Sequence, residues 1–357
     1  MSEHVALPGK LGDPDRTLRT DPRADSRMVA ALETLDLAGA PKPVPLSANA
    51  TAEEIYEYTA KIEPGFEMLL DLIHADLPAV EGVESRTEVI SGVDGNDVNL
   101  YIHQPTSSSG GLRPCILHIH GGGMVILAAS GASYVRWRGE LAALDLVVVG
   151  VEFRNAGGAL GPYPFPAGLN DCTSALEWVH AHRAELGVSK IIVSGESGGG
   201  NLTLATTLKA SREGRLHMID GVYAQCPYIS GAYGDPPMEL TSLHENDGYF
   251  LSSEMMDYMV RAYDPGQENL TNPLAWPLNA SVEDLKGLPP HVISVNELDP
   301  LRDEGLAYFR KLVKAGVSVS SRTVNGTCHA GDVILRGAIP EVYAASARDL
   351  TTFAHTC

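Results

Sequence analysis

Short runs of hydrophobic residues alternate with longer segments of helical periodicity over most of this chain. Seven runs rich in β-branched residues have the length and near-continuous apolar character of buried strands. They are residues 98–103, 115–120, 146–153, 190–194, 222–226, 292–295 and 317–324. Apolar residues at spacings of three and four predict helices over 134–144, 169–185, 201–212, 303–315 and 339–354. This alternation predicts an α/β fold with a mostly parallel sheet of about eight strands and helices on both faces.

Two stretches depart from the alternation and are expected to form accessory structure. Residues 1–25 are polar and rich in Pro and Asp, so we expect a disordered or loosely attached arm. Helical spacing over 28–77, clearest at 52–73, predicts a small helical cap. Residues 227–287 contain no clear strand and one short helix near 253–262.

Parallel sheets of this kind carry their ligand sites at the carboxyl ends of the strands. An insertion after residue 226 would lie over those ends and complete the cap. The predicted organisation is therefore an arm and cap segment at 1–85, an α/β domain at 86–226 and 288–357, and an inserted cap segment at 227–287.

The strongest local motif is Gly195-Glu196-Ser197-Gly198-Gly199. It follows an apolar strand and precedes a helical pattern, which is the context of the nucleophile elbow of α/β-hydrolases. In that turn the serine has a strained backbone, and Gly195 and Gly199 remove side chains that would clash. The alternative is a glycine-rich turn that happens to contain a serine. The strand before it and the helix after it favour Ser197 as a nucleophile.

A second motif, His120-Gly121-Gly122-Gly123, follows the predicted strand at 115–120. Acyl transfer develops an oxyanion, which preorganised backbone N–H groups stabilise. We assign Gly122 and Gly123 as donors, with the N–H of Gly198 as the third. A phosphate loop is the alternative, but no Lys-Ser/Thr pair follows these glycines. His120 is expected to orient the loop.

A serine nucleophile needs a base, and the base needs a carboxylate that orients it. In this fold the chain order is serine, acid, histidine. Asp299 follows the predicted strand at 292–295, and His329 follows the one ending near 324. His329 is the only histidine between Pro300 and His355, so we predict it as the base. Asp299 is preferred to Asp303 as the acid because it comes first after the strand.

Charge and cysteine content narrow the possible partners. The formal net charge is −19, from 26 Lys and Arg against 45 Asp and Glu, which disfavours nucleic-acid and membrane-surface binding. Five scattered cysteines without a CxxC pair fit neither a disulfide framework nor a zinc site. With no apolar leader or membrane span recognised, we expect a cytoplasmic protein.

Together the motifs at 120–123, 195–199 and 299–305, followed by His329, resemble the hormone-sensitive-lipase-like family of carboxylesterases over residues 88–353. The resemblance implies an α/β-hydrolase fold, a Ser-Asp-His triad, an oxyanion hole and a helical cap, and it allows a homodimer. Two departures concern the pocket. The family often has Tyr-Arg-Leu-Ala-Pro-Glu where residues 153–158 read Phe-Arg-Asn-Ala-Gly-Gly, and Asp is commoner than Glu196 before the serine.

We therefore expect an esterase for small, uncharged, short-acyl esters or lactones, with no cofactor and no metal. Met124, Tyr249 and Phe250 are candidate pocket walls, the alternative being that they only pack the core or the cap. A peptidase or amidase on the same fold is the first rival. A non-catalytic small-molecule receptor is the second, although such receptors lose the histidine. We also hypothesise that a bulky thiol reagent on Cys328 would displace His329.

Overall fold

An eight-stranded sheet forms the centre of the molecule. The structure is a computed structural model and describes residues 7–107 and 110–357. The strand order is β1-β2-β4-β3-β5-β6-β7-β8, in which β1 and β2 are antiparallel to their neighbours and all other pairs are parallel. The strands are β1 (Val83–Ser91), β2 (Asp97–Pro105), β3 (Arg113–Ile119), β4 (Val147–Glu152), β5 (Val188–Glu196), β6 (Gly221–Gln225), β7 (His291–Asn296) and β8 (Val319–Val324). The mostly parallel sheet predicted from the sequence is confirmed.

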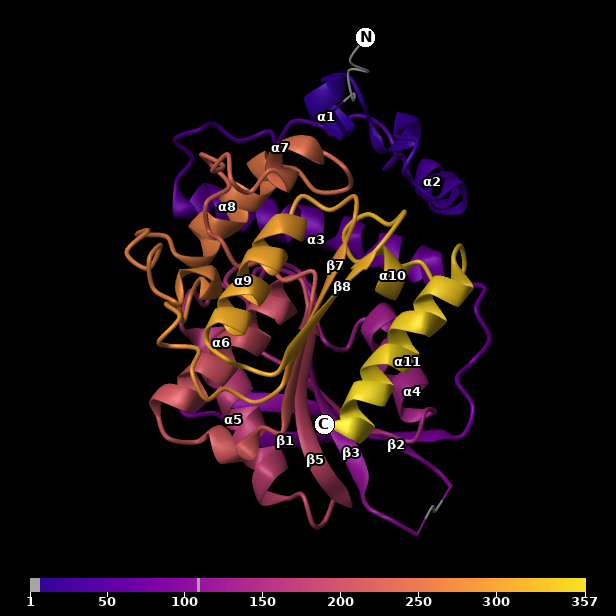
Figure 1. Ribbon diagram of the computed structural model, residues 1–357, viewed down its shortest axis with the longest axis vertical. Coiled ribbons are helices and arrows are strands. Elements are labelled where there is room, and N and C mark those ends of the chain that lie inside the picture. Colours follow the sequence, from indigo (N-terminus) through magenta and orange to yellow (C-terminus); the bar gives the residue numbers. More distant parts are fainter. Residues whose placement is uncertain (1–6, 108–109) are drawn as a thin grey trace.

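Helices cover both faces of the sheet (Figure 1). One face packs against α5 (Ala167–Ala181), α6 (Gly198–Arg212) and α9 (Arg302–Lys314). The other packs against α4 (Ala132–Ala142) and α11 (Pro340–Thr356). Successive residues of the central strands enter opposite layers: Ile116 packs on the α4 and α11 side, and Leu117 on the α5 and α6 side. Burial on both faces is why these strands are continuously apolar.

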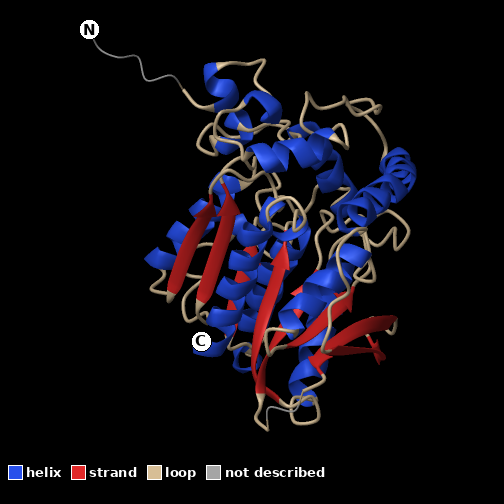
Figure 2. Ribbon diagram, turned by 90° about the vertical axis from the view of Figure 1, so that its right-hand side faces the viewer, coloured by secondary structure: helices blue, strands red, loops and turns tan. Residues whose placement is uncertain are grey.

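A helical cap lies over the carboxyl ends of the parallel strands, toward which the arrowheads point in Figure 2. Its longest element is α3 (Ala52–His74), which begins with a capping box between Thr51 and Glu54. The inserted segment contributes α7 (Ser242–Glu245) and α8 (Ser253–Tyr263) and contains no strand among residues 227–287. The remaining short elements are α10 (Gly331–Ile334), η2 (Leu216–Met218) and η3 (Pro277–Asn279).

The N-terminal arm is packed onto the cap, contrary to the expectation of a loose segment for residues 1–25. Residues 1–6 lie outside the described part, but α1 (Gly9–Gly12), η1 (Leu18–Thr20) and α2 (Ser26–Glu33) are ordered elements. Leu18 is fully buried. The guanidinium of Arg23 pairs with Asp21 and with Glu245 of α7. The charged residues that suggested solvation are thus used in ion pairs with the inserted segment.

The arm also touches the loop that follows β8. The N–H of Asp25 donates to the carbonyl of Gly326 at 2.9 Å, and the N–H of Cys328 lies 3.3 Å from the sulfur of Met28. Residues near the start of the chain therefore support the loop that carries His329.

Strand β1 was not predicted from the sequence. It lies at the edge of the sheet and its residues are mostly exposed, so it lacks the apolar run of a central strand. Because β1 begins at Val83, the expected domain boundary at residue 86 falls inside a strand. No helix in the described residues has the length and hydropathy needed to cross a membrane.

Candidate active site

Ser197 sits on the sharp turn between β5 and α6. Its backbone has φ 57° and ψ −119°, a strained conformation for a residue with a side chain. The flanking glycines are sterically required: a Cβ on Gly195 would lie 2.6 Å from the backbone of Gly199, and one on Gly199 would lie 2.6 Å from the carbonyl oxygen of His120. The motif therefore folds as an elbow that lifts the hydroxyl to the N-terminus of α6.

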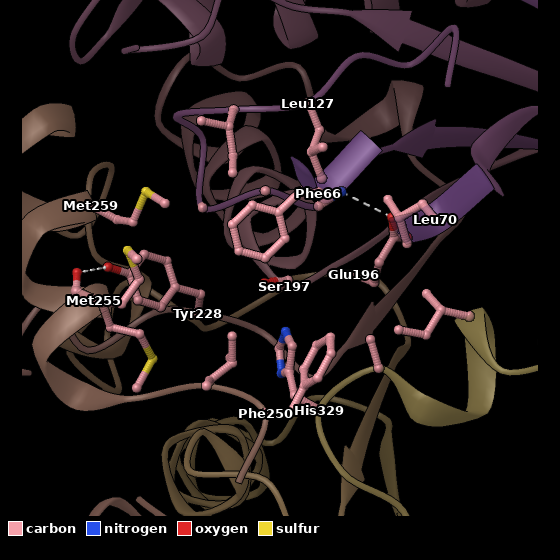
Figure 3. Close-up of a pocket in the computed structure, with 18 of the residues that line it drawn as sticks. Phe66, Leu70, Leu127, Glu196, Ser197, Tyr228, Phe250, Met255, Met259 and His329 are labelled. Carbon is pink, nitrogen blue, oxygen red and sulfur yellow. Dashed lines mark hydrogen bonds between the residues drawn. The ribbon is translucent and has the colours of Figure 1, made fainter. Parts of the chain in front are cut away.

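Asp299 and His329 meet at the ends of β7 and β8. The His329 Nδ1 and Asp299 Oδ2 atoms are 2.8 Å apart, and both side chains are buried. The other carboxylate oxygen of Asp299 accepts from the N–H of Leu301 at 2.9 Å, which fixes its orientation. Ser197 and His329 line the same cavity, and Figure 3 shows the imidazole directed toward Ser197. The structure thus brings together the three residues that the sequence suggested as a triad.

The glycine loop lies beside the elbow. Gly122 and Gly123 have φ values of +100° and +64°, and a Cβ on Gly122 would overlap the carbonyl of Ile126. A Cβ on Gly198 would lie only 2.7 Å from the nitrogen of Gly123, so these two backbones are in close contact. Gly122 and Gly123 line the cavity with Ser197. Glycine is needed here because the chain turns and approaches Ser197 without room for side chains.

Glu196 ties the elbow to the glycine loop, a role that the sequence did not indicate. Its carboxylate accepts from the N–H of Gly121 at 2.9 Å and contacts His118 Nε2 at 3.1 Å. Burial alone would raise the pKa of Glu196. His118 and the other neighbouring groups lower it by more, so the pKa lies below its ordinary value. Glu196 is therefore an ionised, buried anchor.

His120 is neutral and packs within the loop. Burial lowers its pKa to about 4. Its ring stacks on Phe153 with centroids 4.3 Å apart, and Nδ1 contacts the carbonyl of Gly121 at 2.8 Å. These contacts agree with an orienting role and leave His120 unsuited to act as a base at neutral pH.

The loops that carry Asp299 and His329 are held by amide side chains. Asn246, in the inserted segment, donates to the carbonyls of Glu297 and Asp299 at 3.1 and 3.2 Å. Asn296 donates to Thr327 Oγ1 at 2.7 Å, which joins the end of β7 to the turn before His329. These contacts link residues far apart in the sequence, and no local pattern could have revealed them.

The cavity above Ser197 has a volume of about 140 Å³ and mostly apolar walls. Besides the glycine loop, Ser197 and His329, its lining includes Phe66, Leu69, Leu70, Ile126, Leu127, Tyr134, Tyr228, Phe250, Leu251, Met255, Met256 and Met259. Figure 3 shows Phe66 and Leu70 of α3 on one side and Met255 and Met259 of α8 on another. The cap therefore supplies most of the apolar wall.

Of the three wall residues expected from the sequence, only Phe250 lines the cavity. Met124 is buried in the core, where its positive φ of 62° carries the chain away from the glycines. Tyr249 is buried on the arm side of the inserted segment, and its hydroxyl donates to Asp21 at 3.0 Å. The predictions for Met124 and Tyr249 are therefore corrected.

One group of potential metal ligands occurs among the described residues. Ligand-type atoms of Cys226, Asp299 and His329 lie within 4.8 Å of one another, and all three residues are buried. Asp299 and His329 are already hydrogen-bonded to each other. Burial also raises the pKa of Cys226, which disfavours the thiolate that a metal requires. The donor set fits a carboxylate–imidazole pair better than a metal centre.

Comparisons with known proteins agree with the fold. Residues 116–331 match the model of a family described as having the alpha/beta hydrolase fold. The carboxylesterase NlhH of Mycobacterium tuberculosis is 31% identical over 81% of this chain and 94% of its own length. An arylesterase of Saccharolobus solfataricus is 35% identical over 60% of this chain and 67% of its own.

Solved structures give a similar result. Brefeldin A esterase, described as a bacterial homologue of human hormone-sensitive lipase, superposes with a TM-score of 0.95 at 47% identity and covers 98% of each chain. Esterase Est22 superposes with a TM-score of 0.86 at 35% identity, covering 96% of this chain and all of its own.

Proposed function

The chain belongs to the hormone-sensitive-lipase-like family of α/β-hydrolase carboxylesterases, and we propose that it hydrolyses small, uncharged, short-acyl esters or lactones through Ser197, His329 and Asp299. The observation that carries the proposal is the Asp299–His329 hydrogen bond at 2.8 Å, in a cavity that also contains Ser197 and the glycine loop. Nucleophile, base, orienting acid and oxyanion donors are then all present at one site.

In this mechanism His329 accepts the proton of the Ser197 hydroxyl as its oxygen attacks the ester carbonyl. Asp299 holds the imidazole by Nδ1 and stabilises the imidazolium that forms. The backbone N–H groups of Gly122, Gly123 and Gly198 stabilise the oxyanion of the tetrahedral intermediate. Collapse of this intermediate expels the alcohol, which takes a proton from His329. Water then attacks the acyl-enzyme with the same base and releases the acid.

Two features support the substrate class. A cavity of about 140 Å³ resembles in size an engineered apolar cavity of about 150 Å³ that binds benzene, so it admits a small group without rearrangement. Its lining contains no lysine or arginine to pair with a charged acyl group, whose desolvation would be costly. An ester with a short, neutral acyl chain fits both conditions.

The cysteines support a cytoplasmic location as part of this proposal. All five are free thiols, and four of them are buried. Unpaired thiols are typical of reducing compartments.

The proposal is tested by hydrolysis of p-nitrophenyl esters with acyl chains from two to twelve carbons. We expect the wild type to prefer the shorter esters, and Ser197→Ala to lose activity by a factor on the order of 10⁶, the loss measured when a serine protease nucleophile is removed. Ser211→Ala, near the other end of α6, is the matched control. Comparable activity of Ser197→Ala and the wild type would refute the mechanism. Faster cleavage of an aminoacyl anilide than of p-nitrophenyl butyrate would favour the amidase.

A further inference from the structure

We propose that Glu63 of the cap helix α3 is a positioning residue. Its carboxylate holds the loop that continues from the oxyanion glycines, and its helix carries part of the pocket wall. This inference rests on the proposed function and assigns a part of the site to a carboxylate outside the α/β domain. Four observations lead to it: its buried contacts, the loops that it joins, the shape of those loops and the periodicity of the helix.

The Glu63 carboxylate is buried and held by backbone donors. Glu63 is only 2% exposed. Oε1 accepts from the N–H of Leu127 at 2.6 Å, and Oε2 accepts from the N–H of Ala159 at 2.5 Å. No lysine, arginine or histidine pairs with it among the described residues. A buried carboxylate without a cationic partner is costly, so its two N–H donors are what retain it there.

These donors belong to two loops that are already paired. The segment that follows the oxyanion glycines lies against residues 155–157, because Ala156 donates to the carbonyl of Met124 at 2.9 Å and Gly157 donates to that of Val125 at 3.1 Å. Beyond these pairs, both loops turn toward α3. Glu63 binds the N–H of Leu127 on one loop and that of Ala159 on the other, and so closes the two loops together.

The second loop is shaped to admit the helix. A Cβ on Gly158 would lie 2.5 Å from Glu63 Oε2, and one on Gly157 would lie 2.6 Å from Thr59 Oγ1. A side chain at either position would therefore occupy space that α3 uses, and glycine at both leaves room for the carboxylate.

Helical periodicity extends the effect to the pocket wall. Phe66 and Leu70 follow Glu63 at intervals of three and seven, so they lie on the same side of α3, and Leu69 follows Phe66 at an interval of three. All three line the cavity with Ser197, and Leu127 lines it from the oxyanion loop (Figure 3). A shift of Glu63 would therefore displace the apolar wall and the loop of the N–H donors together.

The test compares Glu63→Gln with Glu67→Gln in the p-nitrophenyl ester series. Glutamine keeps one carbonyl oxygen but presents an NH₂ group to the second backbone N–H. We expect kcat to fall about tenfold for every ester and the chain-length preference to change. Glu67 is exposed one turn further along α3, so Glu67→Gln should match the wild type in both respects. A merely structural role would lower the unfolding temperature without altering the ratio of kcat/KM between short and long esters.

Gly158→Ala provides an independent variant if Glu63→Gln does not fold, because its methyl group would displace Oε2 while the charge remains. It should change the chain-length preference in the same direction. Wild-type kcat, KM and chain-length preference in the Glu63→Gln protein, or in Gly158→Ala where it alone folds, would overturn the inference. Failure of the proposed function is seen separately, as an inactive wild type or an active Ser197→Ala variant.

Discussion

The attachment of the N-terminal arm makes a quantitative prediction for Arg23→Gln. The guanidinium pairs with Asp21 at 2.7 Å and with Glu245, and these carboxylate side chains are 1% and 4% exposed. Removing one member of a buried ion pair costs about 3–5 kcal/mol, because the remaining charge is left unpaired. Glu245 keeps Arg302, and Asp21 keeps the Tyr249 hydroxyl. We therefore expect a loss near the lower limit, about 3 kcal/mol in the free energy of unfolding.

Urea denaturation at pH 7 measures this loss, and Arg27→Gln is the matched control. Arg27 lies on the same arm and pairs with Asp25 and Glu341, but its side chain is half exposed. Surface ion pairs contribute little, so the control should denature close to the wild type. Burial alone would raise the pKa of Asp21, but Arg23 and its other partners lower it by more, so the net shift is downward. The ionised Asp21 therefore stabilises the folded protein above its ordinary pKa of 3.8, and this stabilisation is lost as the pH falls below that value. Equal midpoints for both variants at pH 7 would refute the reasoning.

Three further predictions concern the site and its surroundings. Asp299→Asn should lower kcat by about 10⁴, as the equivalent change does in a serine protease, whereas Asp303→Asn should retain activity; equal losses would contradict the assignment of the acid. Burial raises the pKa of Glu304 to about 8, so its contribution to stability is complete below pH 4.5 and is lost as the pH rises to 8. Glu304→Gln should flatten the pH dependence of the unfolding temperature between pH 5 and 8, and an unchanged slope would contradict this. Cys328 is fully buried and burial raises its pKa, so a bulky thiol reagent should inactivate slowly by displacing His329, and Cys328→Ser should abolish that inactivation; unchanged inhibition would exclude this route.

Residues whose placement follows from local backbone geometry could be predicted from the sequence. The elbow at Ser197 needs a strand, a sharp glycine turn and a helix, and each of these has a recognisable sequence pattern within ten residues. The proximity of Asp299 and His329 could be predicted for the same reason, since each follows a strand whose carboxyl end lies at the same edge of the sheet. The parallel sheet itself was predictable because strands buried on both faces are continuously apolar.

Contacts made through the tertiary structure have no such local sequence pattern. Tyr249 and Phe250 are neighbours in sequence, but only Phe250 lines the cavity, because the positive φ of 71° at Phe250 turns the chain between them. Glu63 has the pattern of a solvated helical carboxylate, yet its partners lie 64 and 96 residues away. Arg23, in a segment expected to be loose, reaches Glu245 across 222 residues. Contacts between residues so far apart in the sequence produce no periodic pattern that a single sequence could reveal.

The three methionines of α8 that line the cavity give this site a particular chemical vulnerability. Met255, Met256 and Met259 place thioethers on the apolar wall that faces Ser197. Oxidation to the sulfoxide would convert a flexible apolar side chain into a polar one on the wall of the cavity. Peroxide would then make the cavity wall more polar without changing Ser197, and methionine sulfoxide reductases would reverse the change. The part of this cavity that is most open to oxidation is therefore the wall supplied by the cap.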